Sequence, residues 1–112
     1  MKTAFIFPGQ GAQTVGMGAD VDAEFPVAAE VFRAANDILG FDLRRLCFEG
    51  PADQLNTTTI SQPAIFTVSA AIFEVLRSEL GPDTFAADVT AGLSLGEYTA
   101  LYAAGVLMFE DA

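Results

Sequence analysis

The sequence contains no histidine and no tryptophan, and it is poor in basic residues. Its 112 residues include five Lys or Arg against fifteen Asp or Glu, which gives a formal net charge of −10 at pH 7. Binding to nucleic acid needs clustered basic side chains, so this composition argues against a nucleic-acid partner. The lack of histidine also means that a serine nucleophile in this chain would lack its most common base.

Cys47 is the only cysteine, which excludes an internal disulfide. It lies in an apolar pattern over residues 43–48. We predict that it is a small buried side chain, in preference to a reactive thiol. We expect neither a metal ion nor a cofactor.

A membrane-spanning run is also missing, although 52% of the residues are hydrophobic. The longest apolar stretch, residues 64–76, is interrupted by Thr67, Ser69 and Glu74 and falls short of the roughly 20 residues that a span needs. Near the N-terminus a short apolar run ends at Pro8 without a small-residue cleavage site, so a signal peptide is not indicated. We therefore expect a cytoplasmic protein without a membrane partner.

The pattern along the chain alternates strands with helices. Apolar runs at residues 3–7 and just before Gly92 are predicted to be strands. Helices are predicted over residues 25–39, 42–48, 61–80 and 95–104, with one turn over 52–55. This order predicts an α/β fold with a parallel sheet. Two strands are too few for a stable buried sheet, so we interpret residues 1–112 as the N-terminal part of one larger domain.

Capping residues indicate where these helices begin and end. Pro26 suits the first turn of the helix over 25–39, and Gly40 suits its end. Asp42 is predicted to cap the next helix. The longest helix is predicted to begin with Ser61 as its N-cap and Pro63 in its first turn, after a loop over residues 56–59. Its first half is apolar nearly all round, so we expect it to be buried centrally.

The segment Gly92-Leu93-Ser94-Leu95-Gly96 lies between the second strand and a helix. A strand, Gly-x-Ser-x-Gly and a helix in this order are typical of a nucleophile elbow. The turn is so tight that the backbone of Ser94 is expected to be strained. Glycine fits positions 92 and 96, because a side chain there would collide with the neighbouring strand or helix. The N–H of Leu95 would then point to a developing oxyanion. A plain strand-to-helix turn that Ser94 only caps is the alternative.

A glycine-rich loop with Gly9, Gln10 and Gly11 follows the first strand. Loops at the carboxyl ends of parallel strands share one edge of a sheet, so this loop can lie beside Ser94. Gln10 could then give a second N–H to an oxyanion hole. Gln62 either faces this site or caps the long helix. Gly9, Gly11 and Gln62 are therefore candidates for substrate contact.

Five separated blocks resemble the malonyl-CoA:acyl carrier protein transacylase family. They are residues 7–13 (Phe-Pro-Gly-Gln-Gly-Ala-Gln), 15–18 (Val-Gly-Met-Gly), 50–56 (Gly-Pro-Ala-Asp-Gln-Leu-Asn), 62–64 (Gln-Pro-Ala) and 92–101 (Gly-Leu-Ser-Leu-Gly-Glu-Tyr-Thr-Ala-Leu). The blocks occur in the family's order and cover the whole chain. The resemblance implies part of an α/β-hydrolase-like acyltransferase domain.

The resemblance also implies a two-step malonyl transfer in fatty acid biosynthesis. Ser94 would attack the thioester of malonyl-CoA and form a malonyl ester. The phosphopantetheine thiol of acyl carrier protein would then take the malonyl group. The oxyanion hole is assigned to the backbone N–H groups of Gln10 and Leu95.

Members of this family are much longer than 112 residues. Their catalytic histidine, the arginine that pairs with the malonyl carboxylate and a small ferredoxin-like subdomain all follow the elbow helix. We therefore expect this chain alone to have negligible transacylase activity. It would need the missing C-terminal part, or a complementary chain, as a partner. Leu93 stands where many members have a histidine that is not their base.

Three other functions are considered. An esterase or lipase also uses an elbow, but a Gly-Gln-Gly loop in place of a His-Gly-Gly-Gly type loop speaks against it. A polyketide synthase acyltransferase shares the elbow, whereas the start at Met1 and the continuation over residues 95–98 favour the stand-alone enzyme. An inactive partial domain could act only as a binding module through exposed strand edges.

Overall fold

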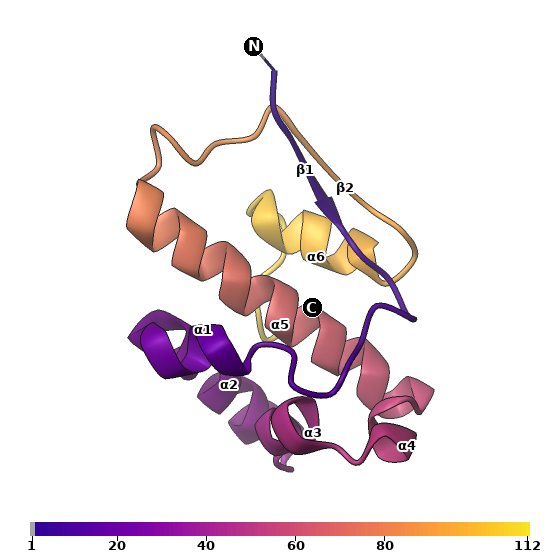
Figure 1. Cartoon of the computed structure of the whole chain (residues 1–112). Helices are drawn as coiled ribbons and strands as arrows, with labels where there is room; N and C mark the ends of the chain where they lie inside the picture. Colours follow the sequence, from indigo (N-terminus) through magenta and orange to yellow (C-terminus); the bar gives the residue numbers. More distant parts are fainter. Residues whose placement is uncertain (1) are drawn as a thin grey trace.

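A helix of 23 residues, α5 (Thr58–Leu80), runs through the middle of the computed structural model, which describes residues 2–112. Figure 1 shows the other elements on two sides of it. One side holds α1 (Ala19–Glu24), α2 (Pro26–Leu39), α3 (Leu43–Glu49) and α4 (Ala52–Leu55). The other side holds β1 (Ala4–Phe7), β2 (Val89–Gly92) and α6 (Gly96–Ala103).

The two strands form a parallel pair, which confirms the predicted α/β class with parallel strands. In their register Ala4 lies opposite Val89 and Phe7 lies opposite Gly92. Both strands therefore end at the same edge of the sheet, and the loops that follow them start side by side.

Helix α2 has the predicted limits, and its buried face is shifted from the predicted stripe but overlaps it. Gly40 ends the helix with a positive φ of 79°, as predicted. The helical spacing of Val27, Val31, Ala34 or Ala35, and Ile38 predicts an apolar stripe. Ala35 is buried and Val27 and Val31 pack half-buried against the core, but Ala28 and Phe32 are also fully buried and Ile38 is 51% exposed. The large ring of Phe32 is fully buried, and it orients the helix.

Helix α3 begins as predicted. The Asp42 carboxylate accepts a hydrogen bond from the Arg45 N–H at 3.1 Å, which is the expected N-cap geometry. Cys47 on this helix is fully buried, and burial raises the pKa of its thiol to about 12 because the thiolate would be desolvated. The thiol is therefore a packing group, as predicted.

The predicted start of α5 is wrong. The helix begins three residues earlier than Ser61, at Thr58, so the predicted loop over 56–59 is half helical. Thr57 is the N-cap, and its carbonyl accepts from the N–H groups of Ile60 and Ser61 at 3.1 and 2.7 Å. Pro63 consequently lies inside the helix, where it has no N–H to donate. The central burial predicted for the first half of α5 is confirmed.

By length and composition alone, α5 could cross a membrane, contrary to the prediction from residues 64–76. Its best 18-residue window has a mean hydropathy of 1.4, and 56% of that window is buried inside the protein. Ala64, Val68, Ala71 and Val75 of this helix join the core formed with α2, α3 and α4. The apolar surface of α5 is thus largely used for packing between the two layers.

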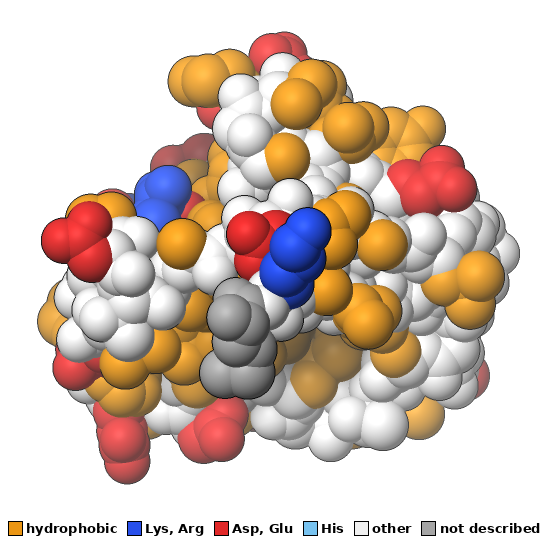
Figure 2. Space-filling model, turned by 90° about the horizontal axis from the view of Figure 1, so that it is seen from above, with side chains coloured by type: hydrophobic (Ala, Val, Ile, Leu, Met, Phe, Trp, Pro, Cys, Tyr) orange, Lys and Arg blue, Asp and Glu red, His pale blue; other side chains and the backbone are white. Residues whose placement is uncertain are grey.

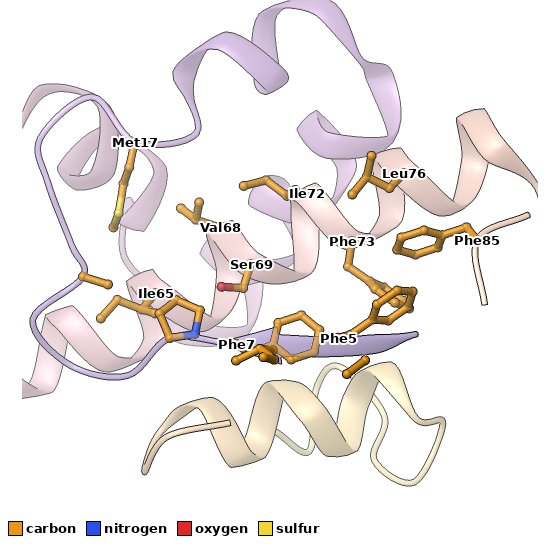
Figure 3. Close-up of a pocket in the computed structure, with 14 residues that line it drawn as sticks. Phe5, Phe7, Met17, Ile65, Val68, Ser69, Ile72, Phe73, Leu76 and Phe85 are labelled. Atoms are coloured by element: carbon orange, nitrogen blue, oxygen red, sulfur yellow. The ribbon is translucent and has the colours of Figure 1, made fainter. Parts of the chain in front are cut away.

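A groove of about 460 Å³ runs along β1 and has a mostly apolar lining. Figure 3 shows Phe5 and Phe7 of β1 and Phe73 of α5 lining it, with Phe85 at one end. Among the described residues β1 pairs only with β2, so its other edge is open beside this groove. The space-filling view in Figure 2 shows further hydrophobic side chains exposed among acidic ones.

Candidate active site

Ser94 occupies a sharp turn between β2 and α6. It has a φ of 54°, in the left-handed region that residues other than glycine rarely adopt. The turn is closed by hydrogen bonds from the Gly96 N–H to the Leu93 carbonyl and from the Glu97 N–H to the Ser94 carbonyl, both 3.0 Å long. Ser94 itself is exposed. This is the strained backbone predicted for a nucleophile elbow.

Close backbone approaches hold the turn in place. A Cβ on Gly92 would lie 2.0 Å from the carbonyl oxygen of Gly96. A Cβ on Gly96 would lie 2.3 Å from the carbonyl oxygen of Phe7, so α6 starts directly against the end of β1. Both positions therefore require glycine, as the sequence predicted.

The loop after β1 packs against the elbow. A Cβ on Gly9 would lie 2.4 Å from the Leu93 carbonyl oxygen and 3.9 Å from the Leu95 nitrogen. Gly9 is buried by this contact, whereas Gln10 and Gly11 are exposed. The structure thus brings the two predicted halves of the site together at one edge of the sheet.

The backbone N–H groups of Gln10 and Leu95 are unused donors. Within residues 2–112 neither N–H has a hydrogen-bond acceptor in the protein. Leu95 lies immediately before α6, where backbone N–H groups and the helix dipole favour negative charge. The Gly11 N–H differs, since it donates to Gln13 Oε1 at 2.8 Å.

The side chain of Gln62 faces the loop and does not cap a helix. Its Nε2 donates to Gln10 Oε1 at 3.3 Å, and Gln10 Nε2 donates to Thr58 Oγ1 at 3.1 Å. Gln13 Nε2 donates to Asn56 Oδ1 at 3.1 Å. Of the two interpretations left open for Gln62, the structure supports the one in which it faces the site.

Thr58, Gln13 and Asn56 were not predicted as site residues. Gln13 and Asn56 occur in the blocks of family resemblance, which was the available signal. Thr58 was placed in a loop because the start of α5 was assigned too late. Hydrogen bonds between segments 43 and 48 residues apart leave no periodic pattern in a sequence.

Helix α6 is tied to its neighbours by two side-chain hydrogen bonds. Thr90 Oγ1 of β2 donates to the Ala100 carbonyl at 2.9 Å. The Tyr102 hydroxyl donates to Glu74 Oε1 of α5 at 2.6 Å. Burial, followed by this contact with Glu74, raises the pKa of Tyr102 above its usual value, so the phenol stays protonated. These contacts fix the helix that follows Ser94.

The site contains no obvious base. The chain has no histidine, and the acidic residue of the first α6 turn, Glu97, is exposed. In the part of the chain that the structure describes, no group of three or more His, Cys, Asp or Glu could hold a metal ion. Within residues 2–112, the predicted site therefore presents an exposed serine hydroxyl and backbone N–H donors, and no histidine that could take the serine proton.

Known proteins resemble this chain along nearly its whole length. The acyl transferase domain family matches residues 4–112. The malonyl CoA-acyl carrier protein transacylase of Haemophilus influenzae is 50% identical over 111 residues, which are 99% of this chain and 35% of that protein.

Two solved structures show the same fold. An acyl-carrier-protein S-malonyltransferase from Bartonella henselae matches with a TM-score of 0.94 at 42% identity, over 99% of this chain and 35% of that one. A malonyl-transacylase in complex with its type II polyketide synthase acyl carrier protein matches with a TM-score of 0.91 at 44% identity, over the same shares.

The chain spans about a third of the length of these relatives, 35% in each case. Its two parallel strands and its helices accordingly correspond to part of their α/β domain. The match with the family model nevertheless extends from Ala4 to the last residue and includes both halves of the site. By sequence and by fold, the chain belongs to the acyl transferase domain family.

Proposed function

We propose that Ser94 is the nucleophile of a malonyltransferase and that this chain contributes the nucleophile and the oxyanion hole. One observation carries the proposal: Ser94 is exposed at a positive φ between the Leu95 N–H and the packed loop that carries the Gln10 N–H, and neither N–H has an acceptor among residues 2–112. Such donors stabilise the negative charge that develops on a carbonyl oxygen during acyl transfer. The names of the relatives, which specify malonyl transfer to acyl carrier protein, support the choice of acyl group.

The first step is attack of Ser94 Oγ on the thioester carbonyl carbon of malonyl-CoA. The serine proton passes to a base, and the carbonyl oxygen becomes negative while the N–H groups of Gln10 and Leu95 donate to it. The C–S bond then breaks, and coenzyme A leaves as a thiol after taking up a proton. The product is a malonyl ester on Ser94.

The second step reverses this chemistry with a different thiol. The phosphopantetheine thiol of acyl carrier protein gives its proton to the base and attacks the ester carbonyl carbon, and the same two N–H groups stabilise the oxyanion. The ester C–O bond breaks, and Ser94 Oγ regains a proton. Malonyl-CoA is a substrate here, and no cofactor or metal is required. Both substrates point to action in the cytoplasm.

The base and the group that binds the malonyl carboxylate would come from the rest of an acyltransferase domain, on the same or a complementary chain. The excess of acidic residues in this chain supports a substrate-binding group from outside it, because a net charge of −10 repels anionic malonyl-CoA. Loss of the base from a serine catalytic group lowers the rate by roughly 10⁴-fold or more.

The direct experiment mixes the purified chain with malonyl-CoA and holo acyl carrier protein. We expect turnover roughly 10⁴-fold below that of the same chain joined to the C-terminal two thirds of a relative. Ser94→Ala in the joined protein should abolish malonyl transfer. Turnover by the 112-residue chain at the rate of the joined protein, or full activity of the Ser94→Ala variant, would contradict the proposal.

Ser94→Cys offers a test that needs no base. A cysteine thiol has a pKa of about 8.5 and reacts as the thiolate, so residue 94 should be malonylated by malonyl-CoA. The rate should rise about tenfold per pH unit below that pKa. Cys47 is a built-in background control, because burial holds the pKa of its thiol at about 12. Peptide mapping should find malonyl on residue 94 and none on Cys47.

A polyketide carrier protein is the second candidate acceptor. One of the similar structures is a malonyl-transacylase in complex with a type II polyketide synthase acyl carrier protein. The similarity covers 99% of this chain. In the joined protein, a panel of acyl donors and of carrier proteins from both pathways separates the two functions. Preference for a fatty-acid carrier protein is the expected result.

A further inference from the structure

The side chain of Gln10 is held at both ends by one helix. Its Nε2 donates to Thr58 Oγ1 at 3.1 Å, and its Oε1 accepts from Gln62 Nε2 at 3.3 Å. Thr58 and Gln62 are four residues apart on α5, so they lie on the same face of the helix, one turn from each other. Both ends of a single amide are thereby fixed by α5.

Apart from the packing of Gly9 against the elbow, the loop that carries Gln10 has few contacts that fix its shape. From Pro8 to Gln13 its backbone makes one hydrogen bond within the loop, from the Ala12 N–H to the Gly9 carbonyl at 3.3 Å. Glycines at two of its positions add conformational freedom, and Gly11 has a φ of 110°. Side-chain contacts must therefore fix much of the loop conformation, because backbone hydrogen bonds do not.

A second contact holds the loop just after Gln10. Gln13 Oε1 accepts from the Gly11 N–H at 2.8 Å, and Gln13 Nε2 donates to Asn56 Oδ1 at 3.1 Å. Asn56 directly follows α4, and Thr58 opens α5. The junction between these two helices is thus joined to the loop at Gln10 and again at Gln13.

We infer that Thr58 is a positioning residue for the oxyanion hole. Its hydroxyl fixes the Gln10 side chain and, through it, the direction of the Gln10 N–H beside the Leu95 N–H. The inference rests on the proposed function of those two N–H groups. A donor has to lie within hydrogen-bond distance of the oxyanion. If the loop were mobile, the Gln10 N–H would stabilise the oxyanion less and acyl transfer would be slower.

The test compares hydroxyl and methyl groups at position 58 in the Ser94→Cys chain. Thr58→Val removes the acceptor and keeps the side-chain shape, whereas Thr58→Ser keeps the hydroxyl. Thr59→Val is the matched control, because Thr59 is the exposed neighbour and makes no side-chain hydrogen bond in the described chain. All variants use the same thiol at residue 94.

Two reactions of that thiol separate positioning from simple access. Malonylation by malonyl-CoA passes through an oxyanion, while exchange with the aromatic disulfide 5,5′-dithiobis(2-nitrobenzoate) does not. Loss of one hydrogen bond corresponds to a change of roughly three- to tenfold. We expect Thr58→Val to slow malonylation by that factor and to leave disulfide exchange unchanged. Thr58→Ser and Thr59→Val should behave like the Ser94→Cys chain.

Backbone ¹⁵N relaxation of the Gln10 amide provides an independent measurement, because motion on the ps–ns timescale lowers the order parameter S². Thr58→Val should lower S² of the Gln10 amide from the rigid range, about 0.85, toward the flexible range below about 0.6, while S² of the Leu95 amide stays constant. Equal malonylation rates in Thr58→Val and Thr59→Val would overturn the inference, and so would equal slowing of both thiol reactions.

A complete lack of malonylation in the Ser94→Cys chain is a different result, because it would overturn the proposed function. The order parameter of the Gln10 amide would still decide whether Thr58 holds the loop. An unchanged order parameter in Thr58→Val would then reject the positioning role as well.

Discussion

At the scale of single residues, the site depends on a backbone conformation that costs free energy. A non-glycine residue in the left-handed region, such as Ser94 with its φ of 54°, is destabilised by roughly 1–3 kcal/mol. The surrounding backbone maintains this conformation, because Gly9, Gly92 and Gly96 each let another segment approach their Cα closely. These glycines are as necessary to the site as the serine that they surround.

Gly92→Ala tests this requirement. Its Cβ would lie 2.0 Å from the Gly96 carbonyl oxygen, so the elbow must move. We expect a loss of about 3 kcal/mol in the free energy of unfolding, measured with urea, from this overpacking.

Gly40→Ala is the control for Gly92→Ala. A Cβ on Gly40 meets no atom within 4 Å, so alanine is disfavoured there only by the positive φ of 79°. We expect a loss of about 1 kcal/mol there. Equal losses in the two variants would show that the elbow is not closely packed.

At the scale of elements, local signals predicted most of the fold. Pro26, Gly40 and Asp42 act on their nearest neighbours in the chain, so the sequence itself marks the limits of α2 and the start of α3. The start of α5 was missed because Ser61 and Pro63 look like residues of a first turn. Thr57 caps that helix through its extended backbone, and its hydroxyl donates back to the Gln54 carbonyl at 2.8 Å instead of accepting from an N–H of the helix.

The cap of α3 gives a prediction at this scale. Asp42 Oδ1 accepts from the Arg45 N–H at 3.1 Å and from Asn36 Nδ2 at 2.9 Å. Asp42→Ala should lower the free energy of unfolding by about 1 kcal/mol, because the Arg45 N–H loses its acceptor.

Asp42→Asn keeps a side-chain oxygen at the same place. It should remain within about 0.5 kcal/mol of the unsubstituted chain in thermal or urea unfolding. The cap would have no role in stability if Asp42→Ala were as stable as Asp42→Asn.

At the scale of the whole molecule, the site is assembled from three distant segments. The parallel order of β1 and β2 predicted that the Gln10 loop and Ser94 would share one edge of the sheet, and the structure has them there. The links from this loop to Asn56 and Thr58 could not be predicted, because they depend on how α5 packs below the sheet. Sheet topology follows from simple rules, whereas such side-chain contacts require coordinates.

The same scale explains the exposed apolar surface. Ile6 on β1 is 79% exposed, Leu93 beside the elbow is 77% exposed, and an apolar groove follows β1 (Figure 3). Relatives that contain this unit are about three times as long, since it makes up 35% of their length. Open strand edges and apolar patches of this kind promote association.

The most direct test of the account is an amide spectrum of the ¹⁵N-labelled Ser94→Cys chain before and after malonylation of residue 94. If the acyl carbonyl lies in an oxyanion hole, the amide protons of Gln10 and Leu95 both become hydrogen-bonded and shift downfield, while the Gly40 amide stays in place. Unchanged Gln10 and Leu95 resonances in a chain that carries malonyl on residue 94 would contradict the account.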